Sequence, residues 1–332
     1  MTRILAIESS CDETAAAVVV DGRRALSSVV ASQDELHAET GGVVPEVAAR
    51  QHLRAVLPVV REALRQAECG WDDLDAIAAT AGPGLPGALV VGLNAARGLA
   101  YGCGLPLIPV DHIEGHVCAN WLGEQEPPLP ALALVVSGGH TELLLMDDHG
   151  RFRRLGGTRD DAAGEAFDKV ARLLDLGYPG GPPLSALALT AQDRSLKLPR
   201  AWLRGSDDFS FSGLKTAVLR TVQGDDAPPV AEVAWAFEQS VADVLSRKAE
   251  RVAEREGVQA LLVGGGVAAN AELRRQLAER AQLPLFIPSP ALCTDNAAMI
   301  GAAAFRHLDE TTDPAGPLDI FSTARRRLRL SP

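Results

Sequence analysis

Short apolar runs that end in turns rich in serine or glycine occur twice along this chain, in the same order. Residues 4–20 consist of an apolar run, the turn sequence ESSCDET and a second apolar run. Residues 131–146 repeat this arrangement around the turn sequence SGGHT. Buried strands are short apolar runs bounded by turn residues, so each passage predicts two strands joined by a tight loop.

A second pair of matching passages follows the first. Residues 75–100 and residues 260–281 each begin with an apolar strand, continue through a glycine-rich turn, AGPGLPG or GGGV, and end in a helical pattern. Such a turn offers backbone N–H groups at a helix N-terminus to an anion. Two halves of this kind predict an α/β protein with the actin-like (ASKHA) ATPase fold, in which two duplicated ribonuclease-H-like lobes face a nucleotide cleft.

A proline-rich stretch between the two halves sets the expected domain boundary. The proline-rich sequence GEQEPPLP at residues 123–130 is a natural connector between lobes. We therefore expect a first lobe over residues 1–125, completed by a C-terminal helix over residues 297–320. The second lobe would cover residues 126–296 and carry a mainly helical insertion at about residues 160–255.

Composition narrows the class of protein. The 332 residues are 47% hydrophobic and 23% charged, as is typical of a globular protein, and the net charge of −11 argues against a broadly basic nucleic-acid surface. The five cysteines form no C-x-x-C pair, which is typical of a reducing compartment. No apolar segment approaches about 18 residues, so we expect a cytoplasmic protein without a membrane contact.

The sequence DHIEGH at residues 111–116 is the best candidate for a metal-holding element. If it is helical, His112 and His116 lie about 40° apart and can reach one ion. Such pairs also arise in ordinary amphipathic helices. A zincin-type endopeptidase needs Glu directly after the first histidine, where Ile113 stands, and Glu114 is displaced by one position. A nucleotide-binding scaffold or chaperone that acts through partners is the other alternative, although its Mg²⁺ would prefer oxygen ligands.

Several motifs in order identify a known family. They are ESSCDET (8–14), TAGPGLPG (80–87), DHIEGH (111–116), VVSGGHT (135–141), DDAAGEAFDK (160–169), YPGGP (178–182), FSFSGLKT (209–216), GGGVAAN (264–270) and CTDNAAM (293–299). Together they resemble the bacterial TsaD proteins of the Kae/TsaD family, which are tRNA N6-adenosine threonylcarbamoyltransferases formerly labelled O-sialoglycoprotein endopeptidases (Gcp).

The resemblance implies an acyl-type transfer. Family members pass the threonylcarbamoyl group of L-threonylcarbamoyl-AMP to N6 of adenosine 37 in tRNAs that read codons beginning with A, and release AMP. The resemblance implies that His112 and His116 bind one divalent metal with Asp295 as third ligand. Iron(II) is the expected ion and zinc the alternative. ATP or ADP with Mg²⁺ are further ligands to consider on this fold.

The resemblance also carries over substrate contacts. They comprise a loop and three separate positions, namely Val135, Val136, Ser137, Gly138, Gly139, His140, Asp168, Gly181 and Asn270. We expect the nucleoside near the last three and the phosphate near the loop. Asp12, which follows the first strand, is our own candidate for positioning the attacking amine or accepting its proton.

The family resemblance further implies partners. These are the tRNA anticodon loop, a TsaB-like paralogue as heterodimer, a TsaE-like ATPase, and TsaC or its larger variant as the source of the adenylate. An acidic chain should bind the RNA backbone weakly by itself. The tail with Arg325, Arg326, Arg327 and Arg329 is the one concentrated basic run, and it departs from the basic, Trp-containing ending associated with the family.

Overall fold

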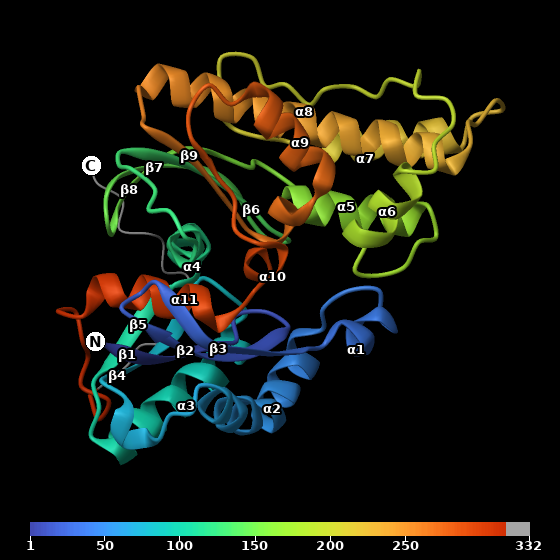
Figure 1. The fold of residues 1–332 in the computed structure, drawn as a ribbon. Helices are drawn as coiled ribbons and strands as arrows, with labels where there is room; N and C mark the ends of the chain where they lie inside the picture. Colours follow the sequence, from blue (N-terminus) through green and yellow to red (C-terminus); the bar gives the residue numbers. More distant parts are fainter. Residues whose placement is uncertain (317–332) are drawn as a thin grey trace. The chain divides into compact units, whose positions relative to one another are not determined.

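The computed structural model describes residues 1–316, which fall into two compact units. Of the described residues, unit 1 comprises Met1–Glu126, His149–Arg151 and residues 295–316, and unit 2 comprises Pro127–Asp148 and Phe152–Thr294. Figure 1 shows the elements of each unit. Within the described part of the chain, no helix has the length and apolar character needed to cross a membrane.

Unit 1 is built on a five-stranded mixed sheet in the order β3-β2-β1-β4-β5. Its strands are β1 (Arg3–Glu8), β2 (Glu13–Val20), β3 (Arg24–Ser32), β4 (Ala76–Gly82) and β5 (Leu107–Asp111). β1 pairs antiparallel with β2 and parallel with β4, and β4 pairs parallel with β5. The central strands are buried on both faces, which explains why they read as continuous apolar runs.

Helices cover both faces of this sheet (Figure 1). α2 (Pro45–Gln66) and α3 (Pro86–Cys103) pack on one face, where Leu5, Ile7 and Val18 point toward them. α11 (Ala297–Ala304) packs on the other face, and α4 (His112–Cys118) packs on α11. The smaller elements are α1 (Asp34–Ala38) and the 3-10 turns η1 (Trp71–Asp73), η2 (Ala119–Leu122) and η4 (Phe305–His307).

Unit 2 repeats this design with a sheet in the order β10-β9-β6-β7-β8. Its strands are β6 (Ala131–Val136), β7 (Thr141–Asp148), β8 (Arg151–Gly157), β9 (Ala260–Gly264) and β10 (Leu285–Phe286). β6 pairs antiparallel with β7 and parallel with β9, as β1 does with β2 and β4. The two predicted hairpins and the duplicated sheet are therefore confirmed.

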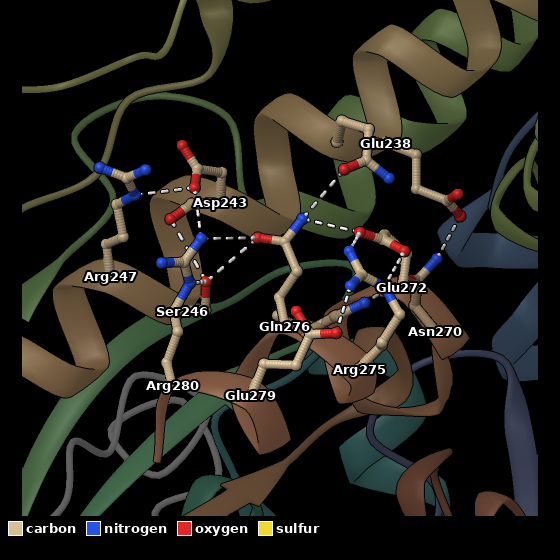
Figure 2. A network of polar contacts seen from close by, with 12 residues as sticks. Glu238, Asp243, Ser246, Arg247, Asn270, Glu272, Arg275, Gln276, Glu279 and Arg280 are labelled. Atoms are coloured by element: carbon tan, nitrogen blue, oxygen red, sulfur yellow. Dashed lines mark hydrogen bonds and ion pairs between the residues drawn. The ribbon is translucent and has the colours of Figure 1, made fainter. Parts of the chain in front are cut away.

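The helices of unit 2 lie in the predicted insertion and after β9. They are α5 (Ala163–Leu173), α6 (Gly181–Ala188), α7 (Ser212–Val222), α8 (Val230–Glu256), the 3-10 turn η3 (Gly266–Ala269), α9 (Ala271–Arg280) and α10 (Pro290–Cys293). Figure 2 shows part of the polar contact between α8 and α9, where Asp243 of α8 accepts hydrogen bonds from Arg247 and Arg280. Arg200 donates to its other oxygen. Burial would raise the pKa of Asp243, but Arg200 and Arg247 outweigh it and hold that pKa below its ordinary value.

The structure corrects one expectation about helices. The C-terminal helix expected over residues 297–320 ends at Ala304, and η4 ends at His307. Residues 308–316 are not helical, because their Asp and Thr residues and Pro314 disfavour a helix interior, and residues 317–320 lie outside the described chain. The mainly helical insertion contains α5 to α8, and between α6 and α7 its residues 191–211 have no regular secondary structure beyond a bridge between Thr158 and Phe209.

Candidate functional site

The predicted histidine helix is confirmed as α4, and local interactions define its start. β5 ends at Asp111, whose side chain accepts hydrogen bonds from the backbone N–H groups of Ile113 (2.8 Å) and Glu114 (3.1 Å). This is the N-cap arrangement that satisfies otherwise unpaired donors of a first helical turn. Burial is the main reason that the pKa of Asp111 rises to about 7.

The two histidines of α4 converge on Asp295, which directly precedes the N-cap of α11. Asp295 Oδ1 lies 3.2 Å from His116 Nε2 and 3.6 Å from His112 Nε2. The two imidazole centroids are 4.6 Å apart, and one ligand atom from each of the three residues lies within 4.8 Å of the others. Both histidines are buried, so the only water-facing member of the set is the partly exposed carboxylate. All three belong to unit 1.

Glu8 at the end of β1 fixes the orientation of His112. Its Oε2 lies 3.1 Å from His112 Nδ1, and the hydroxyl of Thr80 on β4 donates to the same oxygen at 2.5 Å. The backbone N–H of Ser10 donates to Oε1. The carboxylate keeps a proton on His112 Nδ1, so in the neutral imidazole, the form that binds a metal, the lone pair lies on Nε2, the nitrogen that faces Asp295.

Electrostatics at this site favour positive charge. Burial alone would lower the pKa of His112, but the carboxylates of Asp295 and Glu8 outweigh burial and raise the pKa to about 9. Burial likewise opposes ionisation of Glu8, yet the neighbouring imidazole of His112 holds the pKa of Glu8 below its ordinary value. For His116, burial dominates and lowers the pKa.

The donor atoms fit a divalent transition metal. His116 Nε2 lies near Asp295 without hydrogen-bond geometry, and neither ring nitrogen of this buried histidine has a hydrogen-bond partner. A buried imidazole nitrogen without a partner carries a desolvation cost that a bound cation would remove. Two imidazole nitrogens and one carboxylate oxygen, with further positions open, form the ligand set typical of catalytic zinc and of non-haem iron(II).

The glycine loop of unit 1 packs against Ser10, a neighbour of His112. A Cβ on Gly84 would lie 2.6 Å from the carbonyl oxygen of Ser10, and Leu85 N–H donates to that oxygen at 2.7 Å. Ser10 Oγ in turn lies 3.1 Å from His112 Nδ1. The AGPGLPG turn, which the sequence presented as an anion loop, thus packs against the ESSCDET turn and holds Ser10 beside the histidine.

Asp12 lies in an adjacent acidic cluster of unit 1. Carboxylate oxygens of Asp12, Glu13 and Asp34 lie within 4.8 Å of one another. Burial, followed by the charges of Asp295 and Asp12, raises the pKa of Glu13 well above its ordinary value. His52 is buried nearby and has partners at both ring nitrogens, Thr14 Oγ1 at 2.7 Å and the carbonyl oxygen of Cys11 at 3.0 Å.

In unit 2, the predicted substrate loop follows β6. Val135 and Val136 are buried at the end of this strand, Ser137 N–H donates to His140 O at 2.8 Å, and His140 N–H donates to Ser137 Oγ at 3.1 Å. A Cβ on Gly138 or Gly139 would meet no atom within 4 Å. The glycines therefore keep the loop backbone approachable, which is what binding of an anion by N–H groups requires.

The other three predicted substrate residues lie along a chain of hydrogen bonds in unit 2. Asp168 Oδ1 accepts from the N–H of Gly180, directly before Gly181 at the start of α6. One turn on, Ser185 Oγ accepts from Asn270 Nδ2 at 3.0 Å. Asn270 also caps α9 by accepting from the Leu273 N–H at 2.8 Å.

Glu238 of α8 is a member of this chain that the sequence did not reveal. Its Oε1 accepts from Asn270 Nδ2 at 2.7 Å, a contact drawn in Figure 2. Burial raises the pKa of Glu238, although Ser185 and Asn270 oppose the shift. Both amide hydrogens of Asn270 and one lone pair of its Oδ1 are therefore used, so this side chain can meet a ligand only through the second Oδ1 lone pair.

The sequence did not reveal Glu8 and Ser10 as partners of His112, or Thr80 as a partner of Glu8. Glu8 lies within the ESSCDET motif, and its position as the last residue of an otherwise apolar strand was an available signal. A buried carboxylate needs partners, so such a residue at a strand end points to a functional neighbour. Thr80 offered no comparable signal because threonine is common in strands.

Comparison with known proteins agrees with the motifs. Residues 24–302 match the family model TsaD, described as tRNA N6-adenosine threonylcarbamoyltransferase. The protein of that name from Dehalococcoides mccartyi strain CBDB1 is 53% identical over 303 residues, covering 91% of this chain and 93% of the relative. That from Moorella thermoacetica is 54% identical over 312 residues, covering 92% and 91%.

Solved structures with low identity share the fold. HypF from T. kodakarensis superposes with a TM-score of 0.64 at 16% identity, covering 93% of this chain and 48% of that chain. The activator of 2-hydroxyisocaproyl-CoA dehydratase from Clostridium difficile with bound ADPNP gives a TM-score of 0.55 at 15% identity, covering 93% and 96%. These likenesses support the actin-like fold, while the family model and the close relatives show that the chain belongs to the TsaD family of tRNA N6-adenosine threonylcarbamoyltransferases.

Proposed function

We propose that this transferase moves the threonylcarbamoyl group of L-threonylcarbamoyl-AMP to N6 of adenosine 37 in tRNAs that read codons beginning with A, and that His112, His116 and Asp295 hold a divalent metal for the reaction. Iron(II) is our first choice and zinc our second. The convergence of three ligand atoms within 4.8 Å of one another carries this proposal. The Glu8 carboxylate on His112 Nδ1 supports it, because metal-binding histidines typically donate their other ring N–H to such a group.

The reaction replaces one bond to the carbamoyl carbon by another. The N6 amine attacks this carbon, the bond to the AMP phosphate oxygen breaks, and AMP leaves with that electron pair while the amine loses a proton. AMP is a good leaving group, so the protein has to orient a weak nucleophile and stabilise charge on the carbonyl oxygen. A bound divalent ion supplies Lewis-acid stabilisation of such an oxygen.

Unit 2 carries the groups that we assign to the adenylate. Val135 and Val136 would hold the loop from Ser137 to His140 on the sheet, and the backbone at Gly138 and Gly139, where a Cβ would meet no atom within 4 Å, would bind the phosphate. We assign the nucleoside to Asp168, Gly181 and Asn270. Asn270 is preorganised for this role by its bonds to Ser185 and Glu238.

Asp12 is the group that we propose for the amine. It is almost fully buried, with 7% of its surface exposed, in the acidic cluster with Glu13 and Asp34. Within this cluster, burial and then the charges of Asp295 and Asp12 raise the pKa of Glu13. A carboxylate oxygen can act as the general base where it lies within hydrogen-bond reach of the proton that leaves N6.

We propose that tRNA binding and turnover depend on partners. The net charge of −11 disfavours unaided binding to the RNA backbone. α2 exposes Leu53 (66%) and Leu57 (46%), one turn apart, and an exposed apolar pair on a helix fits docking of a helical protein face. We assign this face to a TsaB-like paralogue, with a TsaE-like ATPase and a TsaC-type adenylate source completing the system. The terminal arginines lie outside the described residues.

The cytoplasm, where tRNA is modified and cysteines stay reduced, is the proposed location.

The direct test is mass spectrometry of nucleosides from an unmodified tRNA. The purified protein would be incubated with the tRNA, L-threonylcarbamoyl-AMP and the paralogue, beside a Leu53→Glu/Leu57→Glu variant. Threonylcarbamoyladenosine formed by the wild type supports the proposed reaction, and a loss of complex in the variant on size-exclusion chromatography supports the docking face. Failure of a folded, metal-loaded wild type to form the nucleoside with active partners would contradict the reaction.

A further inference from the structure

The helix that carries both histidines is held on its other side by a contact outside the metal site. Glu114 stands two positions from each histidine, a rotation of about 200° around the helix, so its side chain leaves from the opposite face. Its Oε1 lies 2.8 Å from Nε2 of His307 in η4. Only 7% of the Glu114 side chain and 13% of the His307 side chain are exposed. The sequence positions of these residues differ by 193.

His307 is presented by a segment that is itself fixed to the sheet of unit 1. A Cβ on Gly301 would lie 2.5 Å from Val19, so α11 lies directly on β2 at this point. Phe305 packs on Gly22 in the turn after β2, where a Cβ would lie 2.6 Å from Phe305 Cβ. Close packing of this kind transmits displacement, since there is no space to absorb it.

The same segment supplies the third ligand at its other end. Asp295 precedes Asn296, whose side chain caps α11 by accepting from Met299 N–H at 3.0 Å. From Asn296 to His307 the helical segment extends over roughly 17 Å. α4 crosses it closely, because a Cβ on Gly115 would lie only 2.8 Å from Ile300. α4 therefore contacts this segment at three places: the ligands at one end, Gly115 in the middle and Glu114 at the other end.

We infer that the Glu114–His307 pair is a positioning clamp for the metal ligands, which sets the distance and rotation of α4 relative to α11 and thereby the placement of His112 and His116 against Asp295. This inference rests on the proposed metal role of these three residues. Neither Glu114 nor His307 needs to touch the ion or a substrate. The clamp acts on geometry because a rotation of α4 about its axis moves both imidazoles together with the Glu114 side chain.

Even a small rotation of α4 matters for a metal site. Metal–ligand distances are defined to within about 0.2 Å, so a tilt that moves one imidazole by a few tenths of an ångström lowers affinity and changes coordination geometry. A purely structural ion pair would change the stability of unit 1 without changing the geometry around a bound ion. The ligand field of Co²⁺, reported by its visible absorption, separates these two cases.

The test measures Co²⁺ and Zn²⁺ binding to the full chain by competition with a chromophoric chelator, together with the Co²⁺ spectrum and the melting temperature of the metal-free protein. The variants are His307→Ala, Glu114→Ala, the double variant and His307→Gln, whose amide can still donate to Glu114. Glu310→Gln is the matched control. It removes the other carboxylate near His307, which lies 3.6 Å from Nδ1 on the side away from α4.

We expect His307→Ala and Glu114→Ala each to weaken Co²⁺ binding by roughly tenfold and to shift its spectrum. The double variant should lose no more than either single variant, because both changes open the same clamp. His307→Gln should recover most of the affinity, and Glu310→Gln should match the wild type. His307→Gln and Glu114→Ala decide the question even if His307→Ala fails to fold.

If His307→Ala and Glu114→Ala both bound Co²⁺ with the wild-type affinity and gave the wild-type spectrum, the clamp would be overturned, whatever the melting temperatures of the two variants. Equal losses in Glu310→Gln would also overturn it, since Glu310 pairs with His307 Nδ1, whereas Glu114 pairs with Nε2. A wild-type protein that binds neither Co²⁺ nor Zn²⁺ would instead contradict the metal role of His112, His116 and Asp295. The failure of the clamp and the failure of the proposed function are thus distinguished by the wild-type titration alone.

Discussion

Replacement of Glu8 by Gln should weaken metal binding far more than the loss of one charge suggests. All three groups that meet this carboxylate are donors: Ser10 N–H, the Thr80 hydroxyl and His112 Nδ1–H. A glutamine amide must direct its NH₂ group at one side of this set. If it faces Ser10, two N–H donors oppose each other without an acceptor, which costs about 1–3 kcal/mol in a buried site.

The alternative orientation affects the ligand itself. An NH₂ group facing His112 Nδ1 favours the tautomer in which Nδ1 accepts, and the proton then lies on Nε2, where the metal lone pair is needed. Mutation of the group that hydrogen-bonds a metal-binding histidine typically lowers metal affinity by about 10–100-fold. We expect Glu8→Gln to lower Zn²⁺ affinity by nearly 100-fold, which corresponds to about 2.7 kcal/mol of binding free energy.

The assay is a Zn²⁺ titration in competition with a chromophoric chelator, with the melting temperature of the metal-free protein measured in parallel. Glu62→Gln on the surface of α2 is the control, since it removes the same charge where only neighbouring side chains on the helix are affected. A dissociation constant for folded Glu8→Gln within about threefold of the wild-type value would refute the reasoning that Glu8 sets the His112 tautomer.

Three further outcomes follow from the structure. Asp12→Asn should leave Zn²⁺ affinity unchanged and lower the rate of threonylcarbamoyladenosine formation by roughly 10²–10⁴-fold, and full turnover would contradict its proposed role. Asn270→Ala should raise the KM for the adenylate and lower the melting temperature, because it removes both the α9 cap and the partner of Glu238, at a cost of about 1–2 kcal/mol for the cap. Asp243→Asn should destabilise the protein by about 2–3 kcal/mol near neutral pH, as measured by denaturant unfolding. The folded pKa of Asp243 lies below its ordinary 3.8, so its contribution is present above that pH and is lost as the pH falls further, and the wild type and variant should converge there.

Strongly patterned features were predictable from the sequence. The hairpins around ESSCDET and SGGHT and the helix beginning after Asp111 followed from short apolar runs, turn residues and capping chemistry, which are local. The C-terminal helix was not predictable in extent. Alanine-rich periodicity gave no end point, and α11 ends at Ala304, next to Phe305, which makes a long-range contact with the turn at Gly22.

At the candidate metal site, too, the local features were predictable from the sequence and the long-range contacts were not. The spacing of His112 and His116 was sufficient to place both on one helical face, but the arrival of Asp295 beside them depends on how α11 packs on β2 and α4. Only the family resemblance pointed to that residue in the sequence. Glu8 stood out as the last residue of an apolar strand, but its partners were not predictable because Thr80 lies on another strand and His112 on a helix. Glycine loops were ambiguous too: the one at Gly84 packs on Ser10, whereas Gly138 and Gly139 remain open.

The most direct test of the account compares transfer with metal occupancy in one preparation. Metal-free protein would be loaded with increasing amounts of iron(II) under anaerobic conditions, and in parallel with Zn²⁺. Each sample would then be given L-threonylcarbamoyl-AMP, unmodified tRNA and the partner proteins. Threonylcarbamoyladenosine, measured by mass spectrometry, should rise in proportion to metal occupancy up to one ion per chain and should be absent in a folded His112→Ala/His116→Ala variant. Formation of the nucleoside at an undiminished rate by the metal-free protein or by that variant would contradict it.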